Sequence, residues 1–213
     1  SVTSIGNGAF RACHGLTGVT IPNGVTNIGV AFYNCSNLLS IGVDESNLFY
    51  DSIDGVLFNK TQTTLIEHPG GRGGSYIVPS NVVNIGDTAF ARCLNLTNII
   101  VSSSVKNIGE HAFEYCYGLN SVTIGNSVTN IGQLAFNYCS ALTSIMIPGS
   151  VNKIGFRAFG NCTNLMAFVV DDSNLSYCSL DGCLFKRDQT LLVICPGGKA
   201  GSYSIPNGVS VIG

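Results

Sequence analysis

The chain has 213 residues, a formal net charge of −2 and a charged fraction of 10%, against roughly 25% in an average soluble domain. Ten Lys and Arg scattered among twelve acidic residues form no basic patch, so we expect no nucleic-acid partner. A hydrophobic content of 45% excludes a disordered chain, and no apolar run approaches the roughly 18–20 residues of a membrane-spanning helix.

Nine cysteines are the unusual feature of this composition, and six of them mark an internal repeat. Each of the six follows a phenylalanine by three residues, and each phenylalanine follows an Ile-Gly pair. The isoleucines recur every 23 residues wherever nothing is inserted. A period in the twenties indicates a solenoid. The repeat cysteines are Cys13, Cys35, Cys93, Cys116, Cys139 and Cys162.

One coil, starting at Leu142, reads LTSIMIPGSVNKIGFRAFGNCTN and shows two kinds of spacing. Ile145 and Ile147 alternate as in a strand with one buried face, and Val151 and Ile154 mark a second extended piece. The Ala-Phe-x-x-Cys segment that follows has turn or short-helix spacing. Because no coil can bury its apolar side alone, we expect equivalent strands of successive coils to stack over a continuous core.

These elements predict an α/β solenoid with a parallel β-sheet on its concave side and short helical or 3₁₀ turns on its convex side. The curvature is expected because a helical turn is wider than a strand. The glycine after each repeat isoleucine predicts a bend that needs either a positive φ or a close approach of backbone. These glycines are Gly6, Gly29, Gly86, Gly109, Gly132 and Gly155.

Two segments, residues 43–79 and 170–206, break the period and align with each other without gaps. Each predicts a β-hairpin between coils, with strands over 55–58 and 64–67 in the first copy. We treat residues 1–213 as one domain. Both ends fall inside the repeat pattern and no polar cap is visible, so we expect a fragment of a longer protein. The first residues, SVTSIG, also lack the features of a signal peptide.

The repeat cysteines form a row with one thiol per coil, whereas a zinc site needs about four converging ligands. We therefore expect a buried structural cysteine ladder and no metal, although a few bridges between neighbouring coils stay possible. His14, His68 and His111 have no spacing typical of a nucleophilic site. The glycine-rich loops 69–74 and 196–201 lack phosphate-loop spacing. The sequence thus predicts no cofactor and no enzyme.

The other three cysteines, Cys178, Cys183 and Cys195, lie in the second insert. A valine of the first insert corresponds to Cys183, which suggests a small buried residue. Asp51 and His68 of the first insert, a plausible polar pair, correspond to Cys178 and Cys195. Two changes at two matched positions suggest that Cys178 and Cys195 lie close enough to form a disulfide. Independent drift at the two positions explains the same pattern equally well.

The unit LxxIxIPxxVxxIGxxAFxxCxx resembles the BspA-type leucine-rich repeat, a class found in bacterial and protozoan surface proteins, and the resemblance covers essentially the whole chain. It implies a curved leucine-rich-repeat solenoid, a secreted or cell-surface location, and adhesion to host proteins, extracellular matrix among them, or to other cells. It implies no catalytic residues.

In the strand L-x-x-I-x-I, the residue between the two isoleucines and the one two places earlier point to the concave face. This face is small, weakly polar and almost uncharged, with an apolar stripe that can mark a protein partner. We therefore expect a non-catalytic module that presents this face to a protein or a glycan; the alternative is a structural spacer or self-associating stalk. The candidate residues are Thr20, Ser40, Asn98, Ile100, Ser121, Thr123, Ser144, Met146 and Val169.

Overall fold

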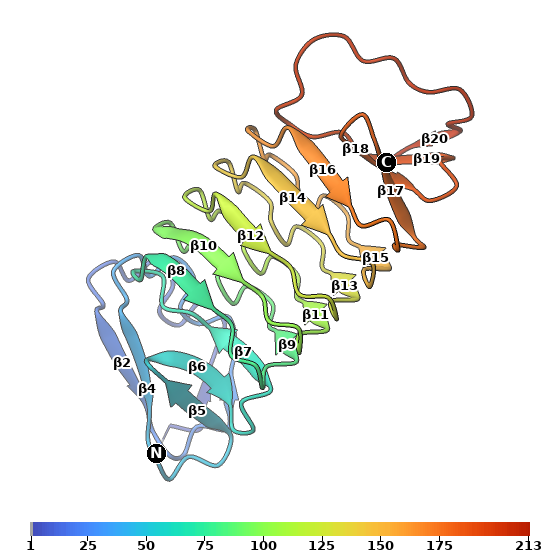
Figure 1. Cartoon of the computed structure of the whole chain (residues 1–213). Helices are drawn as coiled ribbons and strands as arrows, with labels where there is room; N and C mark the ends of the chain where they lie inside the picture. Colours follow the sequence, from blue (N-terminus) through green and yellow to red (C-terminus); the bar gives the residue numbers. More distant parts are fainter. Residues whose placement is uncertain (1) are drawn as a thin grey trace.

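The computed structural model describes residues 2–213, which wind into a β-solenoid of short strands and turns (Figure 1). Most coils contribute two strands. The first strands are β2 (Gly18–Ile21), β4 (Ser40–Val43), β8 (Gly74–Ile77), β10 (Leu96–Ile100), β12 (Ser121–Thr123), β14 (Ser144–Ile147) and β16 (Ala167–Val170). The second strands are β1 (Ser4–Ile5), β3 (Asn27–Ile28), β9 (Asn84–Ile85), β11 (Asn107–Ile108), β13 (Asn130–Ile131), β15 (Lys153–Ile154) and β20 (Val211–Ile212).

Equivalent strands of successive coils pair in parallel, and their registers repeat the 23-residue period. Ile99 pairs with Val122, and Met146 pairs with Val169, so each residue lies beside its counterpart one coil away. The first strands form the sheets β2-β4, β8-β10-β12 and β14-β16. We call their outward side the first-strand face; Figure 1 shows these strands as the row of arrows from β8 to β16. The predicted solenoid with stacked parallel strands is confirmed.

Each insert folds as a three-stranded antiparallel element. These elements are β5 (Tyr50–Ile53), β6 (Val56–Asn59) and β7 (Thr64–Glu67), and in the second copy β17 (Tyr177–Leu180), β18 (Cys183–Lys186) and β19 (Leu191–Ile194). The predicted hairpin is β6–β7. Strand β7 then pairs in parallel with β9, so it serves as the second strand of its coil. Strand β19 pairs with β20 in the same way.

A fully buried asparagine fixes the entry to each insert. The Asn47 Nδ2 group donates hydrogen bonds to the carbonyls of Pro22 and Val25 at 2.8 and 3.0 Å. Its Oδ1 accepts from the N–H groups of Phe49 and Tyr50 at 2.8 and 2.9 Å. The corresponding asparagine of the second insert makes the same four bonds. All polar atoms of the side chain are thereby satisfied, which a buried amide requires.

The prediction of short helical or 3₁₀ turns was wrong, because residues 2–213 contain turns and no helix. The turn of one coil places Thr88 at φ 59° and Arg92 at φ 61°, whereas a right-handed helix needs φ near −63° throughout. The turns instead bond from coil to coil: the Phe90 N–H donates to the Ala112 carbonyl at 2.7 Å. Both residues at positive φ are non-glycine, so the sequence carried no signal for them.

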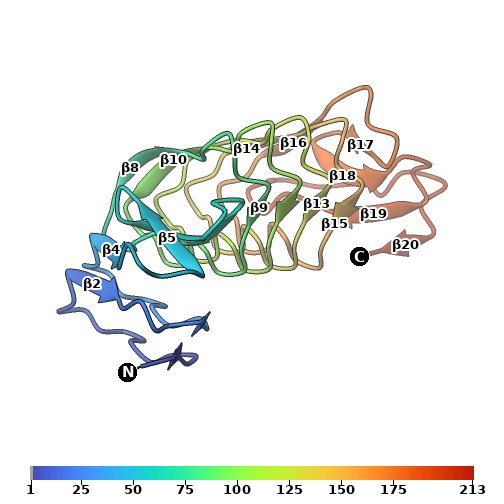
Figure 2. The ribbon, with the colours of Figure 1, turned by 90° about the horizontal axis from the view of Figure 1, so that it is seen from below.

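This ladder of turns also removes the reason for which the sequence predicted a curved stack with its sheet on the concave side. Backbone hydrogen bonds hold neighbouring turns at the same kind of spacing as neighbouring strands. The two sides of the stack therefore advance by similar steps, as the coils between β9 and β15 do in Figure 2. A wider helical layer, which would open one side of the stack, is not present in the described residues.

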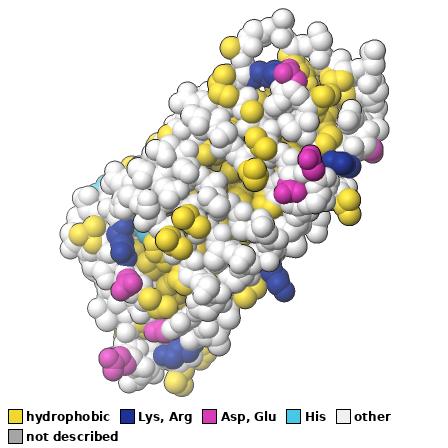
Figure 3. All heavy atoms as spheres, in the orientation of Figure 1, with side chains coloured by type: hydrophobic (Ala, Val, Ile, Leu, Met, Phe, Trp, Pro, Cys, Tyr) yellow, Lys and Arg dark blue, Asp and Glu magenta, His cyan; other side chains and the backbone are white. Residues whose placement is uncertain are grey.

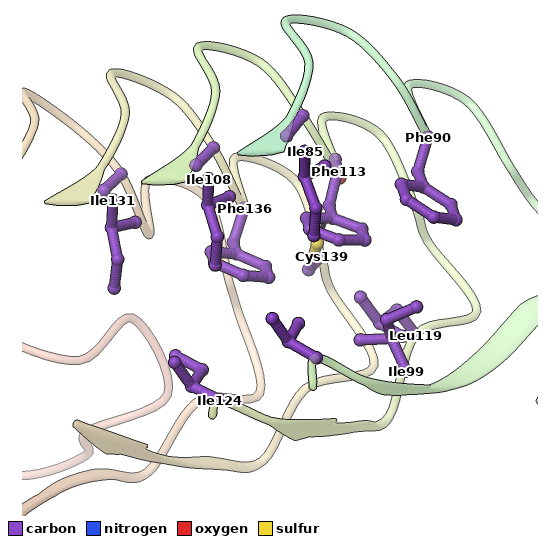
Figure 4. Packing of buried hydrophobic residues seen from close by; sticks show 14 of the residues in the cluster. Ile85, Phe90, Ile99, Ile108, Phe113, Leu119, Ile124, Ile131, Phe136 and Cys139 are labelled. Atoms are coloured by element: carbon purple, nitrogen blue, oxygen red, sulfur yellow. Dashed lines mark hydrogen bonds between the residues drawn. The ribbon is translucent and has the colours of Figure 1, made fainter. Parts of the chain in front are cut away.

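The larger core cluster contains a stack of phenylalanine rings from four successive coils, three of which are labelled in Figure 4. Phe90, Phe113, Phe136 and Phe159 follow one another with ring centroids 4.8, 4.9 and 5.2 Å apart and nearly parallel planes. All four are buried. Large aromatic side chains bury much apolar area, and an offset stack adds to that gain.

The six repeat cysteines form a second row beside these rings. Five are buried and Cys13 is half-buried. The Cys116 thiol donates to the Phe90 carbonyl at 3.0 Å, and the Cys139 thiol donates to the Phe113 carbonyl at 3.3 Å. Burial raises the pKa of Cys116 to about 12, so this thiol stays protonated. The ladder thus consists of hydrogen-bonded core thiols.

The repeat glycines allow a close approach of adjacent coils; none of them has a positive φ. An ideal Cβ on Gly132 would lie 2.6 Å from the Gly109 carbonyl carbon one coil away. The same Cβ on Gly6, in the first coil, would meet no atom within 4 Å. The sequence left two explanations for these glycines, a positive φ or a close approach of backbone. The structure shows that the close approach of the neighbouring coil is the reason.

We predict that Gly132→Ala lowers the free energy of unfolding by about 3 kcal/mol, because the added methyl group must push backbone atoms of the neighbouring coil apart. Gly6→Ala should change it by less than about 0.5 kcal/mol and serves as the matched control. Urea unfolding followed by circular dichroism measures both. Equal effects of the two substitutions would contradict the steric explanation.

Candidate binding surface

The residues predicted for the binding face lie on one side of the molecule. Their side chains project outward from the first strands, where seven are exposed and Asn98 and Ile100 are partly buried. Charged groups gather toward the two ends of the view in Figure 3, and the middle of the first-strand face is mostly uncharged. The seven exposed residues are Thr20, Ser40, Ser121, Thr123, Ser144, Met146 and Val169.

One column of this face carries aliphatic side chains. Ile77 pairs with Ile100 across β8 and β10, and Met146 pairs with Val169 across β14 and β16. The exposed fractions of Ile77, Met146 and Val169 are 64%, 56% and 46%. Thr123 lies between the two pairs. We call Ile77, Ile100, Met146 and Val169 the aliphatic column.

Sequence reasoning missed Ile77 because it lies in the first insert. The signal was available: the insert ends in Tyr-Ile-Val-Pro, which matches Ile-Met-Ile-Pro at residues 145–148 of a regular coil. Aligning the two prolines places Ile77 at the position of Met146. The end of the insert therefore provides the first strand, β8, of the next coil.

The inserts flank the first-strand face and leave the aliphatic column uncovered. The Gly55 carbonyl accepts the N–H of Ile41 in β4 at 2.8 Å, and the Gly182 carbonyl accepts the N–H of Phe168 in β16 at 2.9 Å. These turns lie against the small side chains of Ser40 and Ala167. Each insert thus abuts one edge strand.

A group of partly exposed side chains on the turn side was not predicted. The Arg92 guanidinium lies 4.3 Å from the Tyr115 ring centroid, and its Nε donates to the Tyr33 hydroxyl at 3.0 Å. Tyr115 in turn stacks on Tyr138 at 4.8 Å. Arg92, Tyr115 and Tyr138 occupy the position before the repeat cysteine, so the 23-residue spacing was the signal that could have revealed them. Cation–π contacts and stacking hold these side chains in place.

A polar groove of about 520 Å³ runs along the second strands. Its floor includes Gly86, Gly109 and Gly132, and its walls include Asp87 and Glu110. Asn84, Asn107 and Asn130 also line the groove, with Lys153 at the equivalent position of the next coil. The amides of Asn84 and Asn107 bond to each other at 2.8 Å. Across residues 2–213, no cluster of three or more His, Cys, Asp or Glu side chains could hold a metal ion. The groove therefore provides amide and carboxylate hydrogen-bonding groups.

Each insert also leaves a notch in the row of turns, because it lacks the Ala-Phe-x-x-Cys segment. The first notch holds adjoining cavities of about 190 and 440 Å³, both lined by Val30 and Thr88, with Glu67 in the smaller one. The second notch has a volume of about 390 Å³ and is lined by Ile194 and Cys195. The chain thus carries the same notch twice, with different chemistry in each copy.

Glu67 is a buried acid that lines the smaller cavity of the first notch. Its exposed fraction is 8%, and no other described side chain forms an ion pair with it. Burial raises its pKa well above the usual value of a glutamate. In the second insert Ile194 occupies the corresponding position. A buried carboxyl group without a partner costs stability once it ionises.

We predict that Glu67→Ile, which copies the second insert, stabilises the protein, and that the gain grows as pH rises above about 4.5. The sign follows from the raised pKa: the unfolded state loses its proton first, so the wild type loses stability with rising pH. Urea midpoints at pH 4 and pH 8 measure the change. Glu110→Ile, at an exposed position, should show no comparable pH dependence.

His68 takes the place of a phenylalanine at the end of the ring stack. Its ring centroid lies 4.9 Å from that of Phe90, and its carbonyl is 3.7 Å from the Cys93 sulfur. Burial first, and then the Arg72 charge, lower the pKa of His68 to about 4. The ring is therefore neutral at pH 7 and packs as a core aromatic group.

We predict that wild-type stability falls as pH falls from about 6.5 towards 4, because the unfolded state binds the His68 proton in this window and the folded state does not. The variant His68→Phe should lack this contribution. Relative to wild type, it should gain about 2 kcal/mol on going from pH 8 to pH 5. Unfolding at both pH values measures the difference. A difference that does not depend on pH would show that His68 is not buried in its neutral form.

The other histidines have separate local partners. The His14 Nδ1 atom lies 2.9 Å from the Ser36 hydroxyl, and the His111 Nδ1 atom lies 2.8 Å from Glu114 Oε2. Neither pair includes a third group that would complete a nucleophilic triad. The His68 Nδ1 atom lies 3.5 Å from the Cys93 sulfur, and burial raises the pKa of that thiol well above its usual value, so it stays protonated.

The structure places the insert cysteines differently from the predicted Cys178–Cys195 pairing. All three thiols are free, and Cys195 Sγ lies 3.1 Å from Cys183 Sγ. Cys178 Sγ instead lies 3.5 Å from the Lys186 carbonyl. The strand order explains this, because β18 lies between β17, which carries Cys178, and β19. In the first insert, Asp51 likewise accepts a hydrogen bond from Gln62 at 2.6 Å, whereas the His68 ring packs against Phe90.

The stacked coils, the 23-residue register and the two hairpin inserts define a leucine-rich-repeat solenoid. The family model of the BspA type leucine rich repeat region matches residues 1–71 and 74–190 with six copies. The chain belongs to this family. No curated protein matches it. Within residues 2–213, no helix has the length and apolar character needed to cross a bilayer.

Solved structures share this fold. The pneumococcal vaccine antigen PcpA superimposes with a TM-score of 0.72 at 22% identity, over 92% of this chain and 51% of that one. A leucine rich cell surface protein from Faecalibacterium prausnitzii A2-165 gives a TM-score of 0.70 at 29% identity, over 78% of this chain and 51% of that one. The chain therefore spans about half the length of these two proteins.

Proposed function

We propose that this chain is a non-catalytic binding module of a bacterial cell-surface protein and that its first-strand face contacts a protein partner. The observation that carries the proposal is the aliphatic column, of which Ile77, Met146 and Val169 stay exposed on an uncharged sheet between the two inserts. Exposed apolar groups arranged together are typical of protein contact sites. The matched structure from Faecalibacterium prausnitzii is described as a cell surface protein, which supports the proposed location.

The chemistry of this face favours a protein over a glycan. Ile77, Met146 and Val169 offer aliphatic area, and the parallel column beside them includes the small side chains of Ser121, Ser144 and Ala167, which let another surface approach closely. Methionine adapts its shape to a partner, which suits a flat contact surface. Tyr76 of β8 packs inward against His68 and Phe90, so the outward residues of the first strands include no aromatic ring on which a sugar could stack.

The proposal predicts that the double variant Ile77→Asp, Met146→Asp loses binding to its partner. A panel of purified extracellular-matrix proteins on a biosensor supplies the ligands. The affinity of wild-type protein for a matrix protein should fall at least about tenfold in the variant, because each aspartate would be buried without a counter-ion. The thermal midpoint should stay unchanged, since both side chains are exposed.

Leu48→Asp with Leu175→Asp provides the control. These side chains are 77% and 86% exposed, lie outside the aliphatic column, and add the same charge. This variant should bind as wild type does. Equal loss in both double variants would show an effect of charge alone. Absence of binding in the wild type to every matrix protein would favour the structural-spacer alternative, and light scattering would then test self-association.

A further inference from the structure

The cysteine pair of the second insert lies where neighbouring antiparallel strands place two residues opposite each other. Leu184 pairs with Ile194 across β18 and β19. Cys183 precedes the first of these residues and Cys195 follows the second, so the two cysteines form the next opposed pair. Their sulfur atoms are 3.1 Å apart. We propose that Cys183 and Cys195 form a disulfide bond that fastens the second insert.

The local geometry suits this bond. A disulfide has a length of about 2.05 Å, so the sulfurs need to approach by only about 1 Å more. Across residues 2–213, no other two sulfur atoms are in hydrogen-bond contact. The ladder thiols differ, because each one whose bond is resolved points at a backbone carbonyl of the neighbouring coil, as Cys162 does toward Phe136.

Only one of the two cysteines, Cys195, is accessible to solvent. Cys183 is fully buried in a cluster with Phe185 and Leu192. Cys195 is exposed and lines the second notch. An oxidant can therefore reach Cys195 first, and Cys183 is positioned to complete the bond.

A small disulfide RSSR is a sufficient oxidant. The Cys195 thiol loses its proton, and the thiolate attacks RSSR, forms Cys195–S–S–R and releases one RS⁻. Cys183 then loses its proton and attacks the Cys195 sulfur, which displaces the second RS⁻. The two protons reprotonate the two thiolates released. Overall, the protein dithiol is oxidised by two electrons, and RSSR is reduced to two RSH.

The first insert is a natural comparison for this cross-link. It has Val56 and His68 at the two cysteine positions, and it forms the same three strands. The insert therefore folds without sulfur at these positions, and Cys183→Val is expected to fold. The cross-link would tie the end of β19, where the long 196–210 connection begins, to β18 (Figure 1).

The test is oxidation of the purified reduced chain with oxidised glutathione at pH 8.5, followed by alkylation and trypsin digestion. Cleavage at Arg157, Lys186, Arg187 and Lys199 separates Cys183 in peptide 158–186 from Cys195 in peptide 188–199. We expect these two peptides to migrate as one linked species that reduction separates. The number of alkylated thiols in denatured protein should fall from nine to seven.

Two variants assign the bond, because peptide 158–186 contains other cysteines. Cys183→Val should abolish the linked species, whereas Cys178→Ser should retain it. Retention in Cys183→Val, or a stable glutathione adduct at Cys195 without linked peptides, would overturn the proposal. The assay needs no binding partner, so its result is independent of the proposed binding function.

Discussion

Neighbouring coils of this protein must lie one strand spacing apart along their whole circumference, so that their backbones can form hydrogen bonds. The strands meet this requirement by parallel pairing at a separation of roughly 4.8 Å, and the turns meet it by backbone bonds such as that from Phe90 to Ala112. This spacing also requires glycine at the Ile-Gly position, because a Cβ on Gly132 would collide with the backbone of the preceding coil. The stacked phenylalanine rings follow as well, since identical side chains at this spacing pack face to face. The apolar core is therefore a consequence of a strict coil-to-coil distance.

The same constraint decides what an insert can do. An insert is compatible with the stack only if the chain after it pairs with the next coil in the correct register. In both copies the last insert strand, β7 or β19, does this, because it pairs in parallel with the second strand of the next coil. Asn47 and its counterpart satisfy the backbone groups at the point of departure. The omitted turn is not replaced, and a notch remains. Cavities on the turn side thus arise from the folding requirement of the inserts.

The sequence predicted the features that follow from periodicity. The coil, the parallel stacking, the outward residues and the hairpin β6–β7 could all be read from the spacing of isoleucine, phenylalanine and cysteine. The turns could not, because residues such as Thr88 and Leu134 adopt a left-handed φ that only the neighbouring coil imposes. Ile77 was missed where an insert interrupts the period. The pairing of Cys195 was missed because strand order, which the sequence does not give, separates Cys178 from it.

The two inserts share the residues that their common fold requires and differ at the notch positions. The buried asparagine and the tyrosine that follows it three residues later are the same in both, and each tyrosine hydroxyl accepts an N–H from the coil before at 2.9 or 3.0 Å. The notch positions differ: Glu67 and His68 in one copy, Ile194 and Cys195 in the other. Since both copies form the same strands, the acid and the histidine are not required for folding. Glu67 imposes a cost by its burial, so it departs locally from the pattern that the fold itself favours. The first-strand face and the notches are therefore structurally distinct parts of one stack, on the sheet side and on the turn side.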